Sequence, residues 1–428
     1  ITPDLPVWAS GYANRDHRSD SVADPLQVAA MVLDSGTGTS VILSLDLVGM
    51  DFLTAEPLRR AVAEEVGVEW TAVQLCCSHT HFGPAVTPMR FDSTELPFLD
   101  WEEGALEKVT TASLAAVREA ASSVSEATVS DMTISAPPVA FNRRFVEPSG
   151  RVVTHFRYPD AAEGPLMEQE YDDRLTVVRF DSNGATGAII VHLACHPVCN
   201  ADEGHYALSA DYVHELRRAL DERYGCPILF FQGAAGDVVP ADRFGDSRLR
   251  IGRAIADSVI ANERRLQTDP APTVNVDTIP VTVDLCLTLD PEESKARFDA
   301  VLDERRAAGD DVSQELRARF RYYQSAVFFD RLYGGRSVDT TISMLSLGSL
   351  TFVFLPFEIL SSFALAVERL QEDVRIVAYA NGYQGYLPTA LEVVQGGYEG
   401  GEGSRHAAIG ESERLLALIL EAVESREG

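Results

Sequence analysis

The chain contains no long apolar run. None approaches the roughly 18–20 residues that a helix needs to cross a bilayer, so we expect no membrane insertion. The first ten residues, ITPDLPVWAS, also lack the basic-then-apolar pattern of a secretion signal. The cytoplasm is therefore the expected location, and secretion after removal of a leader stays open.

Positive charge is scarce. The chain has 36 lysine and arginine residues against 65 aspartate and glutamate residues, a net charge of −29, and its only lysines are Lys108 and Lys295. Phosphate groups would be repelled by such a surface, so we expect no binding to nucleic acid or to anionic membranes. A solvated acidic surface accounts for the excess. A small-molecule partner is the remaining expectation, and the sequence leaves open whether the chain forms a homo-oligomer.

Cysteine is also sparse, with six in 428 residues. Cys76 and Cys77 are adjacent on a predicted strand, and the others do not form a disulfide framework. A chain of this size does not need disulfide bonds to stabilise its core, so we predict buried free thiols. The alternative is a zinc site at Cys195-His196-Cys199, although this spacing matches no closed structural zinc site.

No internal repeat or low-complexity linker divides the chain. Predicted strands come in adjacent pairs, such as 174–180 and 187–194 around the turn Asp181-Ser182-Asn183-Gly184, with helices between the groups. This order indicates mixed sheets, an α/β (α+β) class, and not a regular alternation of strand and helix. Residues 291–329 form a charged helical region that we interpret as an excursion from the core.

The most informative stretch is Cys76 to Pro84, CCSHTHFGP, which follows a short apolar run. That profile predicts a buried strand ending in a turn. Because side chains alternate along a strand, His79 and His81 would project to the same side. Two imidazoles there suit metal binding or acid–base chemistry, and a hydrogen-bonded structural pair is about equally consistent with this stretch alone.

Further polar residues fall at predicted strand ends: Arg143, His196, Asp237, Glu358, Tyr386 and Tyr398. Strand ends of one sheet converge in space even when they are far apart in sequence. Two histidines and a carboxylate with one open position form a catalytic zinc arrangement. His192 competes with His196 for this role; we prefer His196, which stands at a strand end before Pro197, and expect His192 to be buried and hydrogen-bonded.

Six motifs in order carry a family resemblance: SHTHFGP, ACHP, FFQGAAGDVVP, LPFE, ANGYQGYLPT and GGYEG. Together, with FNRRF as a seventh, they resemble the catalytic domain of the neutral/alkaline ceramidase family over most of the chain. The resemblance implies four layers, two packed sheets flanked by helices, and one zinc hydrolase domain over residues 1–428. It implies that His79, His196, Glu358 and Tyr386 bind zinc, and that His81, Arg143 and Tyr398 face the substrate.

Three features depart from that family. Its active-site serine is Val239 here, in the sequence Gly236-Asp237-Val238-Val239-Pro240, and its His-Gly-Thr-Ser is His196-Pro197-Val198-Cys199. The family's C-terminal sandwich domain has no counterpart in this sequence. We therefore interpret the chain as a short bacterial-type relative that retains the metal site and acts on another substrate than ceramide.

The predicted function is hydrolysis of an amide (N-acyl) or related ester bond of a small molecule by zinc-bound water, because valine at 239 offers no nucleophile. Asp46 and Asp237 are predicted acceptors for the second N–H of the ligand histidines, or structural turn and cap residues. Arg405 and His406 are predicted to bind the substrate's polar end. Two rivals remain: a zinc Lewis-acid enzyme for cyclisation, elimination or isomerisation, and a metal-binding protein without catalysis.

Overall fold

The computed structural model describes residues 1–12, 15–36, 38–87, 102–160, 164–200, 205–269, 272–286, 290–309, 312–333, 337–401 and 404–427. Everything below concerns these residues. None of their helices is long and apolar enough to cross a membrane.

The first large sheet consists of two hydrogen-bonded groups. One has the order β2-β3-β4 and the other the order β16-β17-β18-β20. They are joined by the bridge between Cys76 in β4 and Ala380 just after β20. Both contain parallel and antiparallel neighbours. The strands are β2 (Val28–Asp34), β3 (Thr39–Leu45), β4 (Val73–Cys77), β16 (Val274–Asp284), β17 (Ser337–Leu347), β18 (Leu350–Phe354) and β20 (Val374–Val377).

The second large sheet has the order β13-β11-β10-β5-β15. Its antiparallel hairpin β10–β11 turns at Asn183-Gly184, where both residues have positive φ, as the predicted turn requires. Strand β13 then joins β11 in parallel. The strands are β5 (Thr128–Ser135), β10 (Arg174–Ser182), β11 (Ala185–Leu193), β13 (Ile228–Gln232) and β15 (Gln267–Asp269).

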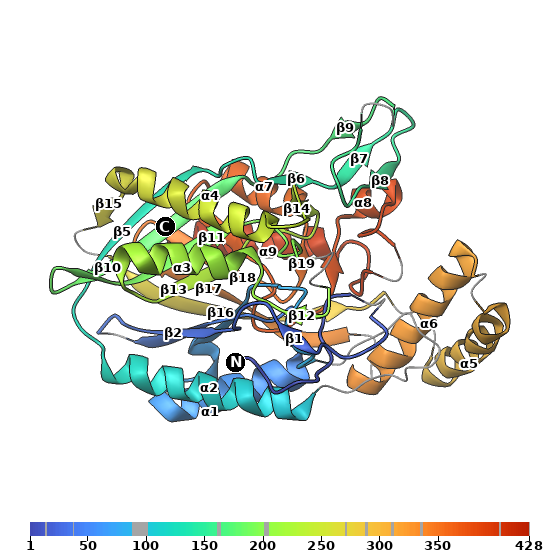
Figure 1. Ribbon diagram of the computed structural model, residues 1–428, viewed down its shortest axis with the longest axis horizontal. Coiled ribbons are helices and arrows are strands. Elements are labelled where there is room, and N and C mark those ends of the chain that lie inside the picture. The colour runs from blue at the N-terminus through green and yellow to red at the C-terminus, as the bar shows by residue number, and fades with distance from the viewer. Residues whose placement is uncertain are drawn as a thin grey trace.

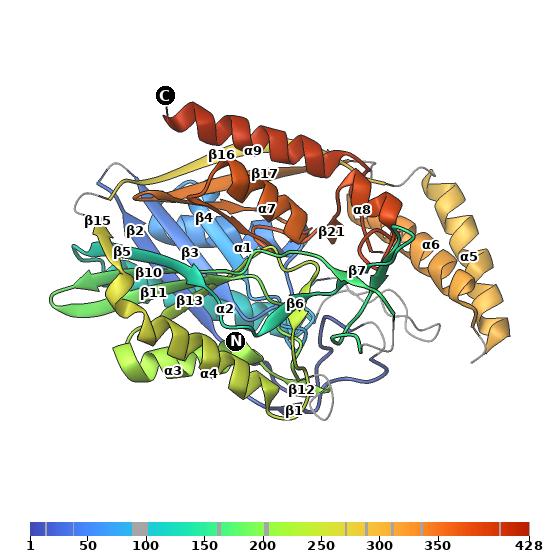
Figure 2. The ribbon, with the colours of Figure 1, turned by 90° about the horizontal axis from the view of Figure 1, so that it is seen from above.

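The alternation of side chains divides the core into three apolar layers. On β4, Leu75 and Cys77 face the layer between the first sheet and helices α1, α2, α7 and α9, whereas Cys76 faces the layer between the two sheets. A third layer lies between the second sheet and α3 and α4. Figures 1 and 2 show this stack from two sides. The helices are α1 (Phe52–Val66), α2 (Glu103–Ser122), α3 (Tyr212–Tyr224), α4 (Ser247–Ala261), α7 (Ser361–Leu370) and α9 (Glu411–Glu427). The four-layer prediction is confirmed.

Short elements complete the described part of the chain. Two-stranded pairings join β1 to β12, β6 to β14 and β19 to β21, and β7 pairs with both β8 and β9. Their bounds are β1 (Ser21–Val22), β6 (Ala140–Asn142), β7 (Arg144–Val146), β8 (Val152–Thr154), β9 (Met167–Glu168), β12 (Ala207–Leu208), β14 (Val238–Pro240), β19 (Glu358–Ile359), β21 (Tyr386–Leu387) and α8 (Ala390–Gln395), with 3₁₀ helices at Trp70–Ala72 and Glu263–Arg265.

The predicted helical excursion is a pair of helices, α5 (Pro291–Ala308) and α6 (Gln314–Tyr333), inserted between β16 and β17. They lie side by side at one end of the molecule in both ribbon views. Phe298 and Phe320 pack between them, with ring centroids 5.7 Å apart. Residues 310 and 311, which fall within the predicted region, lie outside the described residues.

Most predicted elements match the structure within a few residues, with one correction at the site. From the sequence, the strand before Glu358 is predicted to be followed by a helix that opens at Glu358. In the structure Glu358 lies in strand β19, and α7 begins three residues later at Ser361. The reason is pairing, because β19 aligns in parallel with β21 and sets Glu358 opposite Tyr386. The sequence also predicts a helix over residues 101–123 and a strand over residues 274–289. Of these, residues 101 and 287–289 lie outside the described part.

Candidate active site

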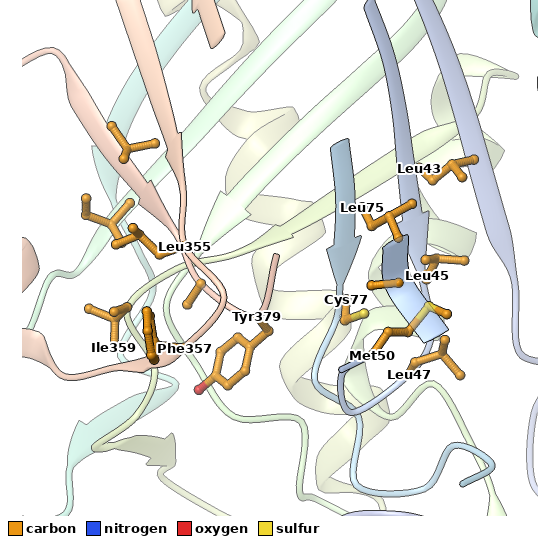
Figure 3. Packing of buried hydrophobic residues seen from close by; sticks show 14 of the residues in the cluster. Leu43, Leu45, Leu47, Met50, Leu75, Cys77, Leu355, Phe357, Ile359 and Tyr379 are labelled. Carbon is orange, nitrogen blue, oxygen red and sulfur yellow. The ribbon is translucent and has the colours of Figure 1, made fainter. Parts of the chain in front are cut away.

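The ends of several strands meet at one place. Gln232, the last residue of β13, is fully buried, and its amide donates to the carbonyls of Ser78 (3.0 Å) and Cys195 (2.7 Å) while accepting from the N–H of Cys195 (3.1 Å). Ser78 precedes His79 and Cys195 precedes His196. One side chain therefore fixes both histidine segments to the end of the second sheet. Figure 3 shows the apolar packing beneath, with Leu45, Cys77 and Met50 on one side and Leu355, Phe357 and Tyr379 on the other.

His79, His81 and His196 form a cluster whose candidate ligand atoms all lie within 4.8 Å of one another. Nε2 of His81 is 3.2 Å from Nε2 of His79. The strand argument predicted this proximity but not its cause: β4 ends at Cys77, and His79 has a φ of 66° in the turn beyond. Positive φ is uncommon for a residue with a Cβ, and here it accompanies the candidate metal centre.

The outer nitrogens of two of these rings are held by backbone carbonyls. Nδ1 of His79 lies 2.6 Å from the carbonyl of Val48, and Nδ1 of His196 lies 3.1 Å from the carbonyl of Val238. Each contact directs the ring's Nε2 inward. The structure therefore differs from our expectation that Asp46 and Asp237 accept these N–H groups. The carboxylate of Asp46 instead accepts from the backbone of Gln27 and from Arg217.

Glu358 brings a carboxylate to the same point. Its Oε2 lies 3.5 Å from Nε2 of His79 and 3.6 Å from Nε2 of His196. Its other oxygen, Oε1, accepts a hydrogen bond from the hydroxyl of Tyr383. Oε2 of Glu358 and Nε2 of His196 are both buried and have no hydrogen-bond partner. Nδ1 of His196 carries the proton, so its Nε2 and Oε2 of Glu358 are both lone-pair acceptors. Two such atoms that face each other across 3.6 Å are what a bound cation would satisfy.

Burial and neighbouring groups together shift the pKa values of His196, His81 and Glu358. It lowers the pKa of His196 to about 4, and it lowers the pKa of His81 well below the ordinary value, with the neighbouring histidines adding to the effect. Burial opposes ionisation of Glu358, but the neighbouring rings of His79 and His196 outweigh burial and hold its pKa well below the ordinary value. A neutral imidazole at His196 beside an ionised carboxylate at Glu358 is the pair of protonation states that binds a divalent metal.

Arg143 lies beside this centre in an aromatic enclosure. Its Cζ is 5.2–5.9 Å from the ring centroids of Phe156, Tyr386 and Tyr398. One terminal nitrogen, Nη2, donates to the hydroxyl of Tyr386 (2.9 Å) and the carbonyl of Gly236 (2.8 Å). No described residue accepts from the other terminal nitrogen, Nη1. Tyr398 is 42% exposed and meets Tyr386 edge to face. The structure thus brings Arg143, Tyr386 and Tyr398 together.

A buried carboxylate that the sequence analysis missed holds Arg143 in place. Glu399 is 0% exposed, and its two oxygens accept from Nε of Arg143 (2.7 Å) and Nη1 of Arg144 (2.8 Å). Burial opposes ionisation of this carboxylate, but Arg143 and Arg144 outweigh burial and lower its pKa. Glu399 adjoins Tyr398, so it ties the GGYEG turn to the strand pair that carries Arg143.

Asp237 has a connecting role instead of the predicted contact with histidine. Its Oδ1 accepts from the backbone N–H and hydroxyl of Ser361, and its Oδ2 accepts from the side chain of Asn142. Burial raises its pKa to about 6, and the charge of Glu392 adds to this. The residue joins the start of α7 after Glu358 to the segment before Arg143.

Arg405 and His406 are both buried. Nδ1 of His406 lies 2.9 Å from the carbonyl of Gln384, and a Cβ at Gly385 would come within 2.7 Å of that ring nitrogen. Arg405 forms an isolated bridge with Tyr386. Both residues thus support the turn that carries Tyr386.

His192 and the cysteines were predicted to be buried. Nε2 of His192 donates to the carbonyl of Ile376 (2.8 Å), and this buried residue lies outside the cluster. All six cysteines are free, and five are buried; Cys286 is half-buried. Three positioning residues were missed: Gln232, Tyr383 and Glu399. Each stands within a quoted motif, FFQGAAGDVVP, ANGYQGYLPT or GGYEG, and this position was the available signal.

Two solved structures match this architecture. Neutral ceramidase from Pseudomonas aeruginosa superposes with a TM-score of 0.70 at 18% identity, over 98% of this chain and 72% of that one. A ceramidase complexed with C2 gives 0.70 at 17% identity, over 100% of this chain and 74% of that one. The chain has a ceramidase-like fold. No protein-family model and no curated protein matches the sequence.

Proposed function

We propose that this protein is a zinc-dependent amide hydrolase that acts on small molecules. The observation that carries the proposal is the pair of orphaned, buried atoms, Nε2 of His196 and Oε2 of Glu358, that face each other beside Nε2 of His79. Nitrogen and carboxylate oxygen donors suit zinc. The ceramidase-like fold supports the same reading.

His79, His196 and Glu358 would hold the ion, with Tyr386 as the fourth candidate. A zinc ion bound there supplies an activated water and polarises the scissile carbonyl. The chain's own groups do the rest. Tyr398 and Arg143 stabilise the negative charge that develops on the carbonyl oxygen; Arg143 does so through Nη1, from which no described residue accepts. His81 passes a proton to the leaving amine. Valine at 239 leaves no hydroxyl for an acyl-enzyme.

His81 also has a second possible role, because it belongs to the three-histidine cluster. His81→Ala separates the two assignments. A proton carrier leaves zinc stoichiometry intact while the rate falls, by about 10²–10⁴-fold. A zinc ligand loses metal and activity together.

The first test is the metal content of the purified protein by mass spectrometry. We expect about one zinc per chain in the wild type and none in the double variant His79→Ala/His196→Ala. His17→Ala, at an exposed histidine, is the control that should keep the metal. A wild type that binds no zinc when the metal is supplied overturns the proposal.

The reaction class is tested with isotopically labelled water. Hydrolysis of an amide in H₂¹⁸O places one ¹⁸O in the released carboxylate, and a chelator should abolish the release. A zinc-dependent product without ¹⁸O would instead identify a cyclisation, elimination or isomerisation. Zinc binding without turnover of any amide or ester would favour a non-catalytic relative.

A further inference from the structure

We infer that the site selects an amide substrate that carries a carboxylate, and that Arg243 binds this group. The inference rests on the proposed amide hydrolysis and adds its substrate class. Its basis is a half-buried guanidinium that bridges two sides of the site without an acidic partner among the described residues.

The contacts of Arg243 place it at the site. Nη2 donates to the hydroxyl of Tyr12 (3.1 Å), and Nη1 donates to the carbonyl of Phe156 (3.0 Å). The ring of Tyr12 meets that of His81 edge to face at 5.1 Å. The ring of Phe156 lies 5.2 Å from Cζ of Arg143. Arg243 is thus one side chain away from the histidine cluster and one from Arg143.

Its third contact reaches the segment after His196. Nε of Arg243 lies 3.3 Å from the carbonyl of Val198. Val198 belongs to the His-Pro-Val-Cys stretch, which departs from the ceramidase pattern. Tyr12, Phe156, Arg243 and Tyr398, which we call the rim, are exposed or half-buried, and Phe156 and Tyr398 meet edge to face at 5.8 Å.

The donor count of Arg243 leaves room for a ligand. A guanidinium has five N–H donors; the three contacts above use three of them, so one remains on each terminal nitrogen. All three acceptors are neutral. A carboxylate would take the two remaining donors and compensate the charge, the geometry in which arginine binds most strongly.

Unlike Arg243, the other arginines near the site either use all their donors on carbonyls or already have a carboxylate partner. Arg15 is buried, and its three nitrogens donate to backbone carbonyls, including that of His81 at 2.8 Å, so all its donors are engaged. Arg143 and Arg144 share Glu399. Asp242, next to Arg243 in the chain, is 2.6 Å from Arg250 instead. In a protein of net charge −29, guanidinium groups thus gather around the site, and the local field favours an anion.

The test uses two anionic probes, each matched to its uncharged primary amide. N-octanoylglycine carries the carboxylate on the amine half, and N-octylsuccinamic acid carries it on the acyl half. Binding to metal-free protein is measured by calorimetry, so that zinc does not contribute. We expect at least one acid to bind ten-fold or more tighter than its amide. The probe that shows the preference identifies which half of the substrate faces Arg243.

Arg243→Gln should reduce the preference to three-fold or less, and Arg243→Lys, which keeps the charge but lacks the fork, should give an intermediate value. Arg118→Gln, at an exposed arginine paired with Glu65, is the control that retains the wild-type preference. A wild type that does not distinguish acid from amide, or a preference that survives in both Arg243 variants, overturns the inference.

Turnover of the same probes by the zinc-loaded protein is measured separately. A binding preference without turnover counts against the hydrolase alone, and turnover without a preference counts against the role of Arg243 alone.

Discussion

At the residue scale, the site depends on side chains that position other side chains. Nδ1 of His79 and of His196 lie against backbone carbonyls, Tyr383 holds one oxygen of Glu358, and Glu399 holds Arg143. Contacts of this kind fix the orientation of metal ligands and typically account for a 10–100-fold effect on metal affinity. They also make specific variants informative.

Tyr383→Phe removes the hydroxyl that donates to Oε1 of Glu358. We expect zinc affinity to fall by about 10–100-fold, because the freed carboxylate samples other orientations. Stoichiometry at saturating zinc should stay the same. Competition with a chromophoric chelator measures the affinity. Tyr158→Phe is a matched control, since that exposed hydroxyl donates to Glu168 at 2.8 Å outside the site. Equal affinities of wild type and Tyr383→Phe would contradict the assignment.

Glu399→Gln leaves Arg143 and Arg144 without their shared carboxylate. Removing one partner of a buried ion pair costs about 3–5 kcal/mol in the free energy of unfolding, and here two arginines lose their partner. Urea denaturation measures the loss. Glu304→Gln, in the exposed pair with Arg319, should cost about 1 kcal/mol or less. A similar small cost at position 399 would show that Glu399 does not hold this part of the site.

At the element scale, polar contacts join the two sheets next to the apolar layer. His192 on β11 reaches the carbonyl of Ile376 on β20, and the guanidinium of Arg375 donates to Thr176 and Thr133 on the opposite sheet. Burial lowers the pKa of His192 to about 4 from an ordinary value of 6.5. The sheet interface therefore contains a group that resists protonation.

His192 predicts a pH dependence of stability. Its folded pKa lies below its unfolded pKa, so between about pH 6.5 and pH 4 the unfolded chain binds one more proton than the folded chain. The contribution of His192 is complete above pH 6.5 and is lost as the pH falls, by about 3 kcal/mol in total. The free energies of unfolding of wild type and His192→Gln, measured by urea denaturation from pH 7.5 to 4.5, should converge at low pH. His17→Gln, at an exposed histidine, should follow the wild type. A difference in the free energy of unfolding between wild type and His192→Gln that stays constant with pH would contradict this account.

At the scale of the whole molecule, the four layers and the helical pair α5–α6 are separable. Strands β16 and β17 remain paired up to Asp284 and Ser337, so the pair is an insertion into a β-hairpin. The two helices contact each other and lie side by side at one end of the molecule in Figures 1 and 2. A hairpin can be closed by a short turn, and loop length changes stability only slowly.

Replacement of residues 290–333 by a short Gly/Asn linker should therefore leave a folded protein. We expect one zinc per chain, as in the wild type, and a Tm within about 5 °C, checked by metal analysis and calorimetry. Deletion of α7 is the contrasting variant, because its Phe363 and Val367 lie in the main core cluster, and it should prevent folding. Loss of zinc on replacing α5–α6 would show that the helical pair supports the site.

Local sequence patterns predict most of the elements and most of the candidate site residues. Apolar alternation predicted the strands, and Asn183-Gly184 predicted the hairpin, because local backbone preferences decide both. Histidines before a Gly-Pro turn and a glutamate after an apolar strand indicated a metal site. Strand periodicity accounted for β4 but not for the turn at His79, where a long-range contact with the carbonyl of Val48 overrides the local pattern.

Only the tertiary structure decided which partner each polar group has. Glu358 lies in a strand because β21 pairs with it, Asp46 bonds Arg217 instead of a histidine, and Glu399 is buried between two arginines. The side chain of Gln232 connects two segments that lie 154 and 37 residues earlier in the chain. Such pairings depend on which strand ends meet, and strand ends meet only when the two sheets pack on each other.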